Sequence, residues 1–137
     1  MSALVPIRQL EYTILFARNL PRMREFYERT MKFPIDHELG PQWISYRIGN
    51  TLLTLTERGL LFHDPSPPAG TLGVQLAFRV DLEDVDRWTA ALEAQGVAMV
   101  LPPTDQPWGH RTVFFRDPDG NMLEVFADIS PASNIGT

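Results

Sequence analysis

The 137-residue chain contains no cysteine, which excludes disulfide bonds, thiol nucleophiles and cysteine–zinc sites. It also lacks an apolar run of the roughly 18–20 residues that a membrane-spanning helix needs. Residues 1–6 lack the basic and long apolar regions of a secretory signal peptide, so we expect a cytoplasmic protein. Basic residues number only 12 against 17 acidic ones, giving a net charge of -5. Nucleic-acid binding normally needs a basic surface, so neither a nucleic acid nor a membrane is an expected partner.

What remains is the composition of an ordinary globular protein, with 44% hydrophobic and 21% charged residues. The length suffices for one domain with a real core but not for two independent domains. We therefore expect a single domain over residues 1–137.

The end of the chain carries a strong β-hairpin pattern. Two β-rich runs, residues 111–115 and 122–126, flank the sequence Asp117-Pro118-Asp119-Gly120-Asn121. Pro118 presets φ for a turn, and Gly120 can adopt a positive φ without strain. Side chains alternate along a strand, so Glu124 shares a face with Met122 and Phe126. A carboxylate among large apolar side chains must be paired, hydrogen-bonded, neutral or bound to a cation.

Strand-like and helix-like segments occur twice in the same order. Asn19 is a suitable N-cap, Pro21 fits a first helical turn, and Gly96 is a suitable helix end. In the first half, the pattern predicts strands at 7–17, 33–39, 43–48 and 51–57 and a helix at 20–30. In the second half, it predicts strands at 72–80 and 98–101, the hairpin, and a helix at 84–95. The second helix is expected to turn Val85, Trp88, Ala91 and Leu92 toward the core.

These elements define two modules, about 7–57 and about 72–128, joined by a proline-rich linker at about 58–71 and followed by a tail at 129–137. An offset of 75 − 12 = 63 residues places Tyr12 against Gln75 and Ala17 against Val80. The sequence thus predicts a structural repeat.

Taken together, the motifs resemble the vicinal oxygen chelate superfamily, which includes glyoxalase I, fosfomycin- and bleomycin-resistance proteins and extradiol dioxygenases. The resemblance covers residues 7–128 and rests on Leu10-Glu11-Tyr12, Asn19-Leu20-Pro21, Phe26-Tyr27, Ala77-Phe78-Arg79-Val80-Asp81, Pro107-Trp108-Gly109 and Asp117-Pro118-Asp119-Gly120-Asn121-Met122-Leu123-Glu124. It implies an α+β fold of two βαβββ modules whose curved mixed sheets form a cup-like cleft. It also implies a homodimer, with the cleft built within one chain or across two.

In metal-dependent members of this superfamily, His, Glu or Gln side chains hold a divalent ion such as nickel, manganese, zinc or iron. The resemblance places Tyr12, Thr54, Gln75 and Glu124 at these positions. Glu124 is an ordinary ligand and Gln75 a weak one, whereas phenol and threonine hydroxyls are poor ligands. The three histidines, His37, His63 and His110, fall at none of these positions. We therefore expect the metal site to be incomplete and no cofactor to be needed.

Glu124 has three readings. It could be a metal ligand, a hydrogen-bonding or acid–base group for an organic ligand, or a structural carboxylate. In the last case its partner would be Tyr12, Gln75, Arg79 or Arg111.

Other side chains are candidates for contact with a ligand. Trp108 lies in a predicted loop, where a stacking platform is a plausible role, and Arg111 could either meet an anionic group or form a surface ion pair. The complete predicted ligand-binding set is Tyr12, Trp43, Thr54, Gln75, Trp108, Arg111, Glu124 and Phe126.

The sequence therefore favours a metal-independent small-molecule binding protein of the bleomycin-resistance type. One alternative is a lactoylglutathione-lyase-like lyase or a dioxygenase, with a metal held by Glu124 and Gln75. Another is metal-free isomerase or lyase chemistry with Glu124 as the catalytic base. The fold alone does not distinguish between these functions, because one fold can support many chemistries.

Overall fold

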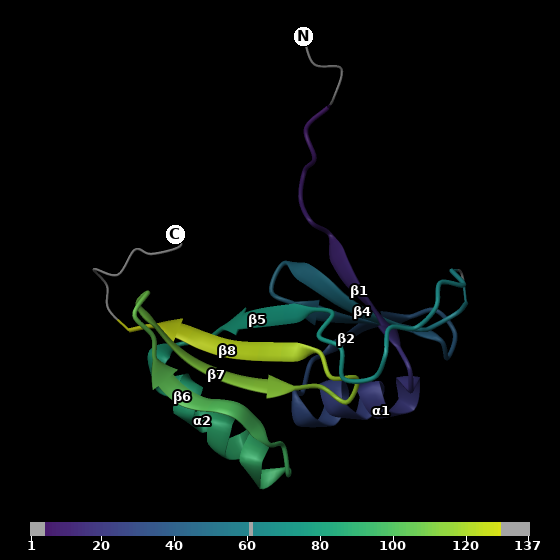
Figure 1. Ribbon diagram of the computed structural model, residues 1–137. Coiled ribbons are helices and arrows are strands. Elements are labelled where there is room, and N and C mark those ends of the chain that lie inside the picture. The colour runs from purple at the N-terminus through teal and green to yellow at the C-terminus, as the bar shows by residue number, and fades with distance from the viewer. Residues whose placement is uncertain (1–4, 61, 130–137) are drawn as a thin grey trace. The chain divides into compact units, whose positions relative to one another are not determined.

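The computed structural model describes residues 5–60 and 62–129 (Figure 1). Contacts divide the chain into two compact units, Met1–Asp64 and Pro65–Thr137. Each unit contains one four-stranded mixed sheet, which confirms the predicted α+β class and the two modules. The predicted tail lies, apart from residue 129, outside the described residues.

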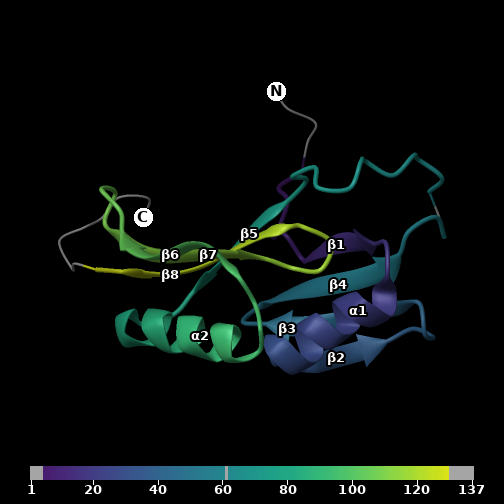
Figure 2. The same cartoon turned by 60° about the horizontal axis from the view of Figure 1, so that its bottom comes forward.

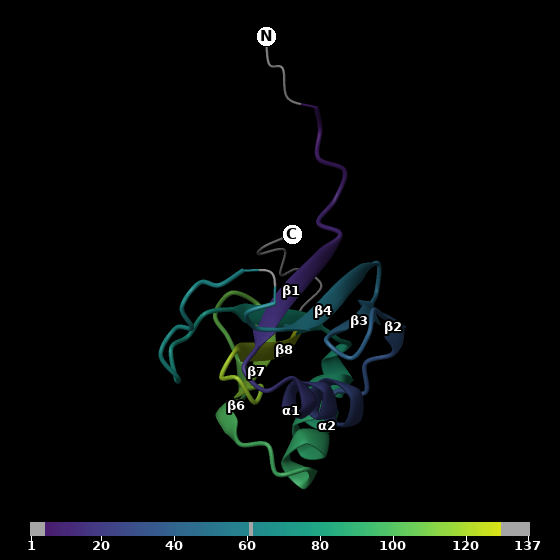
Figure 3. The same cartoon turned by 90° about the vertical axis from the view of Figure 1, so that its right-hand side faces the viewer.

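The first unit runs β1 (Tyr12–Ala17), α1 (Leu20–Glu25), η1 (Phe26–Thr30), β2 (Ile35–Glu38), β3 (Trp43–Ile48) and β4 (Thr51–Glu57). Its strands lie in the order β1-β4-β3-β2, which can be followed in Figure 3. β1 is parallel to β4 and the other neighbours are antiparallel. The helical segment covers one face of this sheet (Figure 2).

The predicted helix at 20–30 exists, but its second half is wider than an α-helix. Asn19 caps it as expected, since its side chain accepts a hydrogen bond from the Arg22 backbone N–H at 3.1 Å. From Phe26 to Thr30 the backbone follows a π-helix, and the Met31 N–H donates to the Phe26 carbonyl at 2.9 Å. Met23 and Tyr27 are fully buried, so the apolar side of the segment is the one that packs.

The second unit repeats this topology. It runs β5 (Gln75–Arg79), α2 (Leu82–Ala94), β6 (Met99–Asp105), β7 (His110–Arg116) and β8 (Met122–Asp128), with sheet order β5-β8-β7-β6. β5 is parallel to β8, as β1 is to β4. Figure 2 shows α2 along one face of this sheet. No helix among residues 5–60 and 62–129 has both the length and the apolarity to cross a membrane.

The two units match in register as well as in order. Tyr12 pairs with Leu52, and Gln75 pairs with Met122, at the start of the two parallel strand pairs. Two residues further on, Thr54 and Glu124 occupy equivalent places in β4 and β8. The predicted 63-residue offset between Tyr12 and Gln75 is confirmed.

Several predicted strand ends are wrong for physical reasons. The strand predicted at 7–17 begins only at Tyr12, because β4 starts at Thr51 and offers almost no partner to the residues before it. The strand predicted at 72–80 is confined to Gln75–Arg79. The strand predicted at 98–101 instead continues to Asp105, because β6 is an edge strand whose register shifts accommodate two prolines.

The predicted burial of one residue in α2 is also wrong. Ala91 is exposed, whereas Thr89 is buried with Val85 and Leu92. Positions 85, 89 and 92 follow the helical repeat, and the Thr89 hydroxyl donates to the Val85 carbonyl at 3.0 Å. Burial of Thr89 is therefore possible without an unsatisfied hydroxyl.

Candidate functional site

The predicted carboxylate lies on the face of the second sheet that α2 does not cover, called here the open face. Leu123, Val125 and Ala127 of β8 are almost completely buried, on the side of the sheet that α2 covers. Strand alternation therefore turns Glu124 and Phe126 to the opposite, open face. The predicted sharing of a face by Met122, Glu124 and Phe126 follows directly from this register.

Glu124 is nearly buried there, with 9% of its surface exposed. It lies between Ala77 of β5 and Phe114 of β7. Gln75 Nε2 donates a hydrogen bond to Glu124 Oε1 at 3.2 Å. A carboxylate has about four acceptor positions, so one amide donor leaves it able to accept further hydrogen bonds. The sequence left Gln75 open as a partner, and the structure brings the two together.

Arg79 and His110 also lie on this open face, although neither belongs to the predicted ligand-binding set. Arg79 Nη1 lies 2.7 Å from Asp128 Oδ2, and His110 Nε2 lies 3.3 Å from Asp128 Oδ1. The Arg79 guanidinium also lies 4.7 Å from the Phe126 ring centroid, as does the His110 ring. The period-two pattern of β5 would have placed Arg79 beside Gln75, whereas its pairing with Asp128 depends on a contact 49 residues away.

Arg111 is directed away from this face. Its Nη2 lies 3.0 Å from Asp86 Oδ1 of α2, and its Nη1 lies 2.8 Å from Asp105 Oδ1 of β6. Hydrogen bonds to Asp105 and then Asp86 raise the pKa of Arg111 above its ordinary value. This placement favours the ion-pair alternative for Arg111, and neither Arg79 nor Arg111 is paired with Glu124.

The predicted residues of the first unit lie on the open face of its own sheet. Thr54 is completely buried, and its hydroxyl lies 2.7 Å from that of Ser45, which is opposite it on β3. Tyr12 is 45% exposed and meets the Trp43 ring edge-on, with centroids 6.4 Å apart. Trp43 Nε1 is buried and finds no hydrogen-bond acceptor in the part of the chain that the structure describes.

Trp108 lies in the tight turn between β6 and β7. The turn is closed by a 2.7 Å hydrogen bond from the Gln106 N–H to the His110 carbonyl, and Gly109 adopts a φ of 91°. Trp108 is 41% exposed. Its predicted role as a stacking platform stays a prediction.

The donors at the four family positions do not fit a divalent ion. In the second unit these donors are one carboxylate and one amide. In the first unit they are a phenol and a threonine hydroxyl that is already hydrogen-bonded. Among the described residues, no three His, Cys, Asp or Glu side chains gather closely enough to hold a metal ion. Divalent ions such as nickel, manganese, zinc and iron usually bind to several carboxylate, imidazole or carbonyl groups.

The fold defines a class of proteins built from repeated βαβββ modules, and comparisons with known proteins identify the family. The model of the Glyoxalase/Bleomycin resistance protein/Dioxygenase superfamily matches residues 9–125. The chain belongs to this superfamily, which confirms the resemblance drawn from its motifs.

Individual relatives agree with this assignment. A glyoxalase/bleomycin resistance protein/dioxygenase from Nocardioides has a similar structure, with a TM-score of 0.81, 20% identity and coverage of 96% of this chain and 91% of that one. A lactoylglutathione lyase from Agrobacterium tumefaciens gives a TM-score of 0.69 at 26% identity, over 89% and 95% of the two chains. The uncharacterized protein YraH of Bacillus subtilis is 25% identical over 82% of this chain and 92% of its own length.

Proposed function

We propose that this protein binds a small organic molecule on the open face of the second sheet, without a metal ion. The observation that carries the proposal is the nearly buried carboxylate of Glu124, whose hydrogen-bond donor is the Gln75 amide. A buried carboxylate is stabilised by each additional donor that it accepts from. A ligand N–H or O–H group would supply such a donor.

The surroundings of Glu124 suit an apolar or aromatic ligand. Phe126 and Phe114 lie on the same face and are only partly buried, so their rings offer apolar surface beside the polar pair. Ligand pockets generally combine apolar walls with a few oriented polar groups. The ligand contacts predicted for Trp108 in this unit, and for Tyr12, Trp43 and Thr54 in the first unit, stay predictions.

Binding is best tested by tryptophan quenching with a panel of aromatic compounds and antibiotics that includes bleomycin. We expect at least one compound to bind, and the substitution Glu124→Gln to weaken that binding about tenfold by removing a charge-assisted hydrogen bond. Glu93→Gln, an exposed position on α2, is the matched control and should bind as the wild type does. Equal affinity in the wild type and Glu124→Gln would refute a ligand role for this carboxylate.

A lyase of the lactoylglutathione-lyase type is the second candidate. It is favoured by the similarity to the lactoylglutathione lyase of Agrobacterium tumefaciens. It is also favoured by Glu124, which the family resemblance places at a metal-ligand position on β8. This function requires a metal ion in spite of the poor donors at Tyr12 and Thr54. Metal titration separates it from the leading proposal.

We also propose a homodimer, as is usual in this superfamily. Sedimentation velocity over a dilution series should show a species of twice the chain mass of 15.6 kDa that dissociates on dilution. A monomer at every concentration would contradict the proposed dimer.

A further inference from the structure

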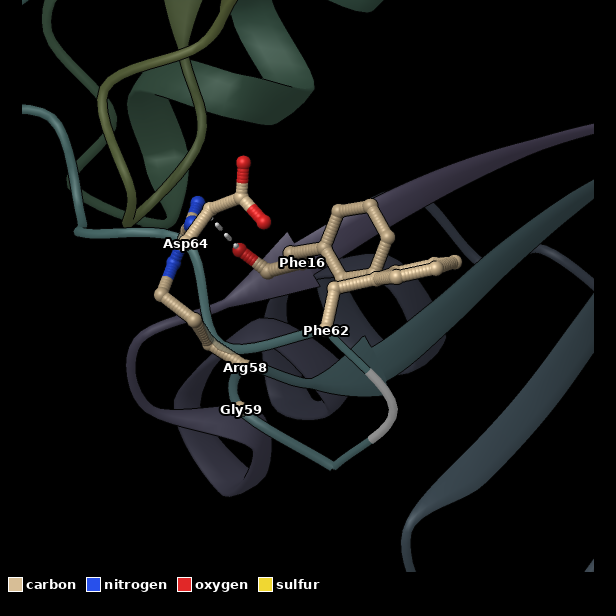
Figure 4. Close-up of a pocket in the computed structure, with 5 residues that line it drawn as sticks. All are labelled: Phe16, Arg58, Gly59, Phe62 and Asp64. Atoms are coloured by element: carbon tan, nitrogen blue, oxygen red, sulfur yellow. Dashed lines mark hydrogen bonds between the residues drawn. The ribbon is translucent and has the colours of Figure 1, made fainter.

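The first unit contains a cavity of about 370 Å³ between the end of β1 and the segment that follows β4. Phe16, Arg58, Gly59, Phe62 and Asp64 line it (Figure 4). Its volume is within the range of small-ligand pockets, about 300–1,000 Å³. All five residues belong to the first unit, so an inference about this cavity does not depend on the function proposed for Glu124.

Two phenylalanine rings form the apolar wall of the cavity. Phe16 and Phe62 meet edge-on, with centroids 6.2 Å apart and planes at 75°. Both rings remain accessible, with Phe16 37% and Phe62 59% exposed. Aromatic rings prefer such edge-to-face or offset contacts. The exposed surface of this pair is therefore suited to receive a third ring.

Arg58 supplies a cation with unused hydrogen-bond donors. Its backbone N–H donates to the Ala17 carbonyl at 3.1 Å, and its Nη2 donates to the Phe16 carbonyl at 3.3 Å. The guanidinium carbon lies 6.0 Å from the Phe16 ring centroid. Arg58 Nε is buried and has no acceptor among the described residues. An unsatisfied buried donor is unfavourable, so an arriving carboxylate that pairs with this guanidinium would be stabilised.

Asp64 adds the opposite charge to the same cavity. Among residues 5–60 and 62–129, no ion pair within 4.0 Å joins Asp64 to Arg58, although both line the space. Figure 4 shows the two rings together on one side, with the guanidinium and the Asp64 carboxylate toward the other. The cavity thus presents an aromatic wall, a cation and an anion that do not neutralise each other directly.

We propose that this cavity binds an aromatic zwitterion, of which a free aromatic α-amino acid is the simplest example. The ring of the ligand packs against Phe16 and Phe62, its carboxylate accepts hydrogen bonds from Arg58, and its ammonium group donates to Asp64. A simple aromatic anion would be repelled by Asp64, and a simple aromatic cation by Arg58. The pair of opposite charges therefore selects a ligand that carries both.

Amide NMR spectra of the full chain, titrated with L-phenylalanine, test the proposal. We expect saturable shifts of the Gly59 and Phe62 amide signals. N-acetyl-L-phenylalanine lacks the ammonium charge and phenethylamine lacks the carboxylate, so each should bind about tenfold more weakly, which corresponds to about 1.4 kcal/mol.

Two substitutions assign the charges to the two ends of the ligand. Arg58→Gln should weaken L-phenylalanine binding about tenfold. It should strengthen phenethylamine binding, because it removes the charge that repels this cation. Asp64→Asn should weaken L-phenylalanine binding similarly and strengthen binding of the anion N-acetyl-L-phenylalanine, which Asp64 no longer repels. Arg87→Gln, exposed on α2, and Leu60→Ala, exposed beside the cavity, are matched controls that should bind as the wild type does.

Three results would overturn the proposal. The first is the absence of shifts at Gly59 and Phe62 with millimolar L-phenylalanine. The second is equal binding of all three compounds, and the third is shifts confined to β5, β7 and β8. Because Asp64 lies in an exposed segment outside the strands, Asp64→Asn keeps the test decisive even if Arg58→Gln perturbs folding.

Discussion

At the scale of one residue, Glu124 is nearly buried and has one neutral hydrogen-bond donor, Gln75, among the described residues. The residue is 9% exposed, and its carboxylate accepts a 3.2 Å hydrogen bond from Gln75, while the nearby arginines pair with other acids. A residue placed purely for stability would be expected to have a stronger partner in this environment. The arrangement therefore supports the ligand role proposed for this carboxylate.

The stability of Glu124→Gln distinguishes these roles. The amide keeps an acceptor oxygen for Gln75 Nε2, so we expect the free energy of unfolding to change by no more than about 1 kcal/mol. Urea denaturation measures this change, with Glu93→Gln as the reference. A loss of several kcal/mol would show that the carboxylate is a structural group.

Tyr46 makes the first unit sensitive to alkaline pH. Burial, followed by the hydrogen bond of its hydroxyl to Glu28 Oε2 at 2.8 Å, raises the pKa of Tyr46 above its ordinary value of 10.0. Nearby Arg24 lowers it by a smaller amount. The phenol therefore stays protonated in the folded protein while the unfolded chain loses this proton above about pH 10, so stability is lost as pH rises beyond that value.

Tyr46→Phe should remove this alkaline loss. We expect the free energy of unfolding to fall more steeply in the wild type than in Tyr46→Phe between about pH 9 and about pH 11. Urea denaturation at several pH values measures both slopes. Parallel slopes would mean that the Tyr46 phenol ionises equally in the folded and unfolded chains.

The face shared by Met122, Glu124 and Phe126 could be predicted from sequence, because it depends only on alternation within one strand. The pairing of Arg79 with Asp128 could not. It depends on which strand lies on the far side of β8, and β5 is 49 residues away in sequence. The Phe16–Phe62 cavity was also missed, because it involves the segment that the proline content marks only as a linker.

At the scale of elements, the β7–β8 turn shows how strongly local sequence defines structure. Asp117 is buried, and its Oδ1 accepts hydrogen bonds from the backbone N–H groups of Asp119 and Asn121, both at 3.0 Å. The Gly120 N–H donates to the Asp117 carbonyl at 2.9 Å, and Gly120 adopts a φ of 90°. The turn predicted from this pentapeptide is confirmed.

Gly120→Ala tests the backbone requirement of this turn. A Cβ at Gly120 would meet no atom within 4 Å, so its cost comes from the positive φ alone, about 1 kcal/mol. Gly73→Ala is the matched control, because it also has open space but no positive φ, and it should be neutral or slightly stabilising. Equal effects of the two substitutions on the urea midpoint would contradict this explanation.

The existence of the elements was predictable because caps, turns and periodicity are local signals. Their ends were less predictable, since β1 begins where β4 first offers a partner. The π-helix η1 was not predictable from the sequence pattern, and no single side chain in the structure explains it.

At the scale of the whole molecule, two units of the same topology carry different residues at the equivalent positions. Thr54 and Glu124 match in register, as do Tyr12 and Gln75. The repeat was visible in the sequence, and the fold of each unit follows from it. The chemistry differs because the first unit presents hydroxyl groups where the second presents a carboxylate and an amide.

Metal binding distinguishes a metal-free ligand site at Glu124 from a metal-dependent one. We would titrate the chelated protein with nickel, manganese, zinc and iron(II) by calorimetry, using Glu124→Ala as the control. We expect no binding in the micromolar range that depends on Glu124, because a carboxylate and an amide are too few donors. Micromolar or tighter binding that disappears in Glu124→Ala would refute the metal-free site and favour metal-dependent lyase or dioxygenase chemistry.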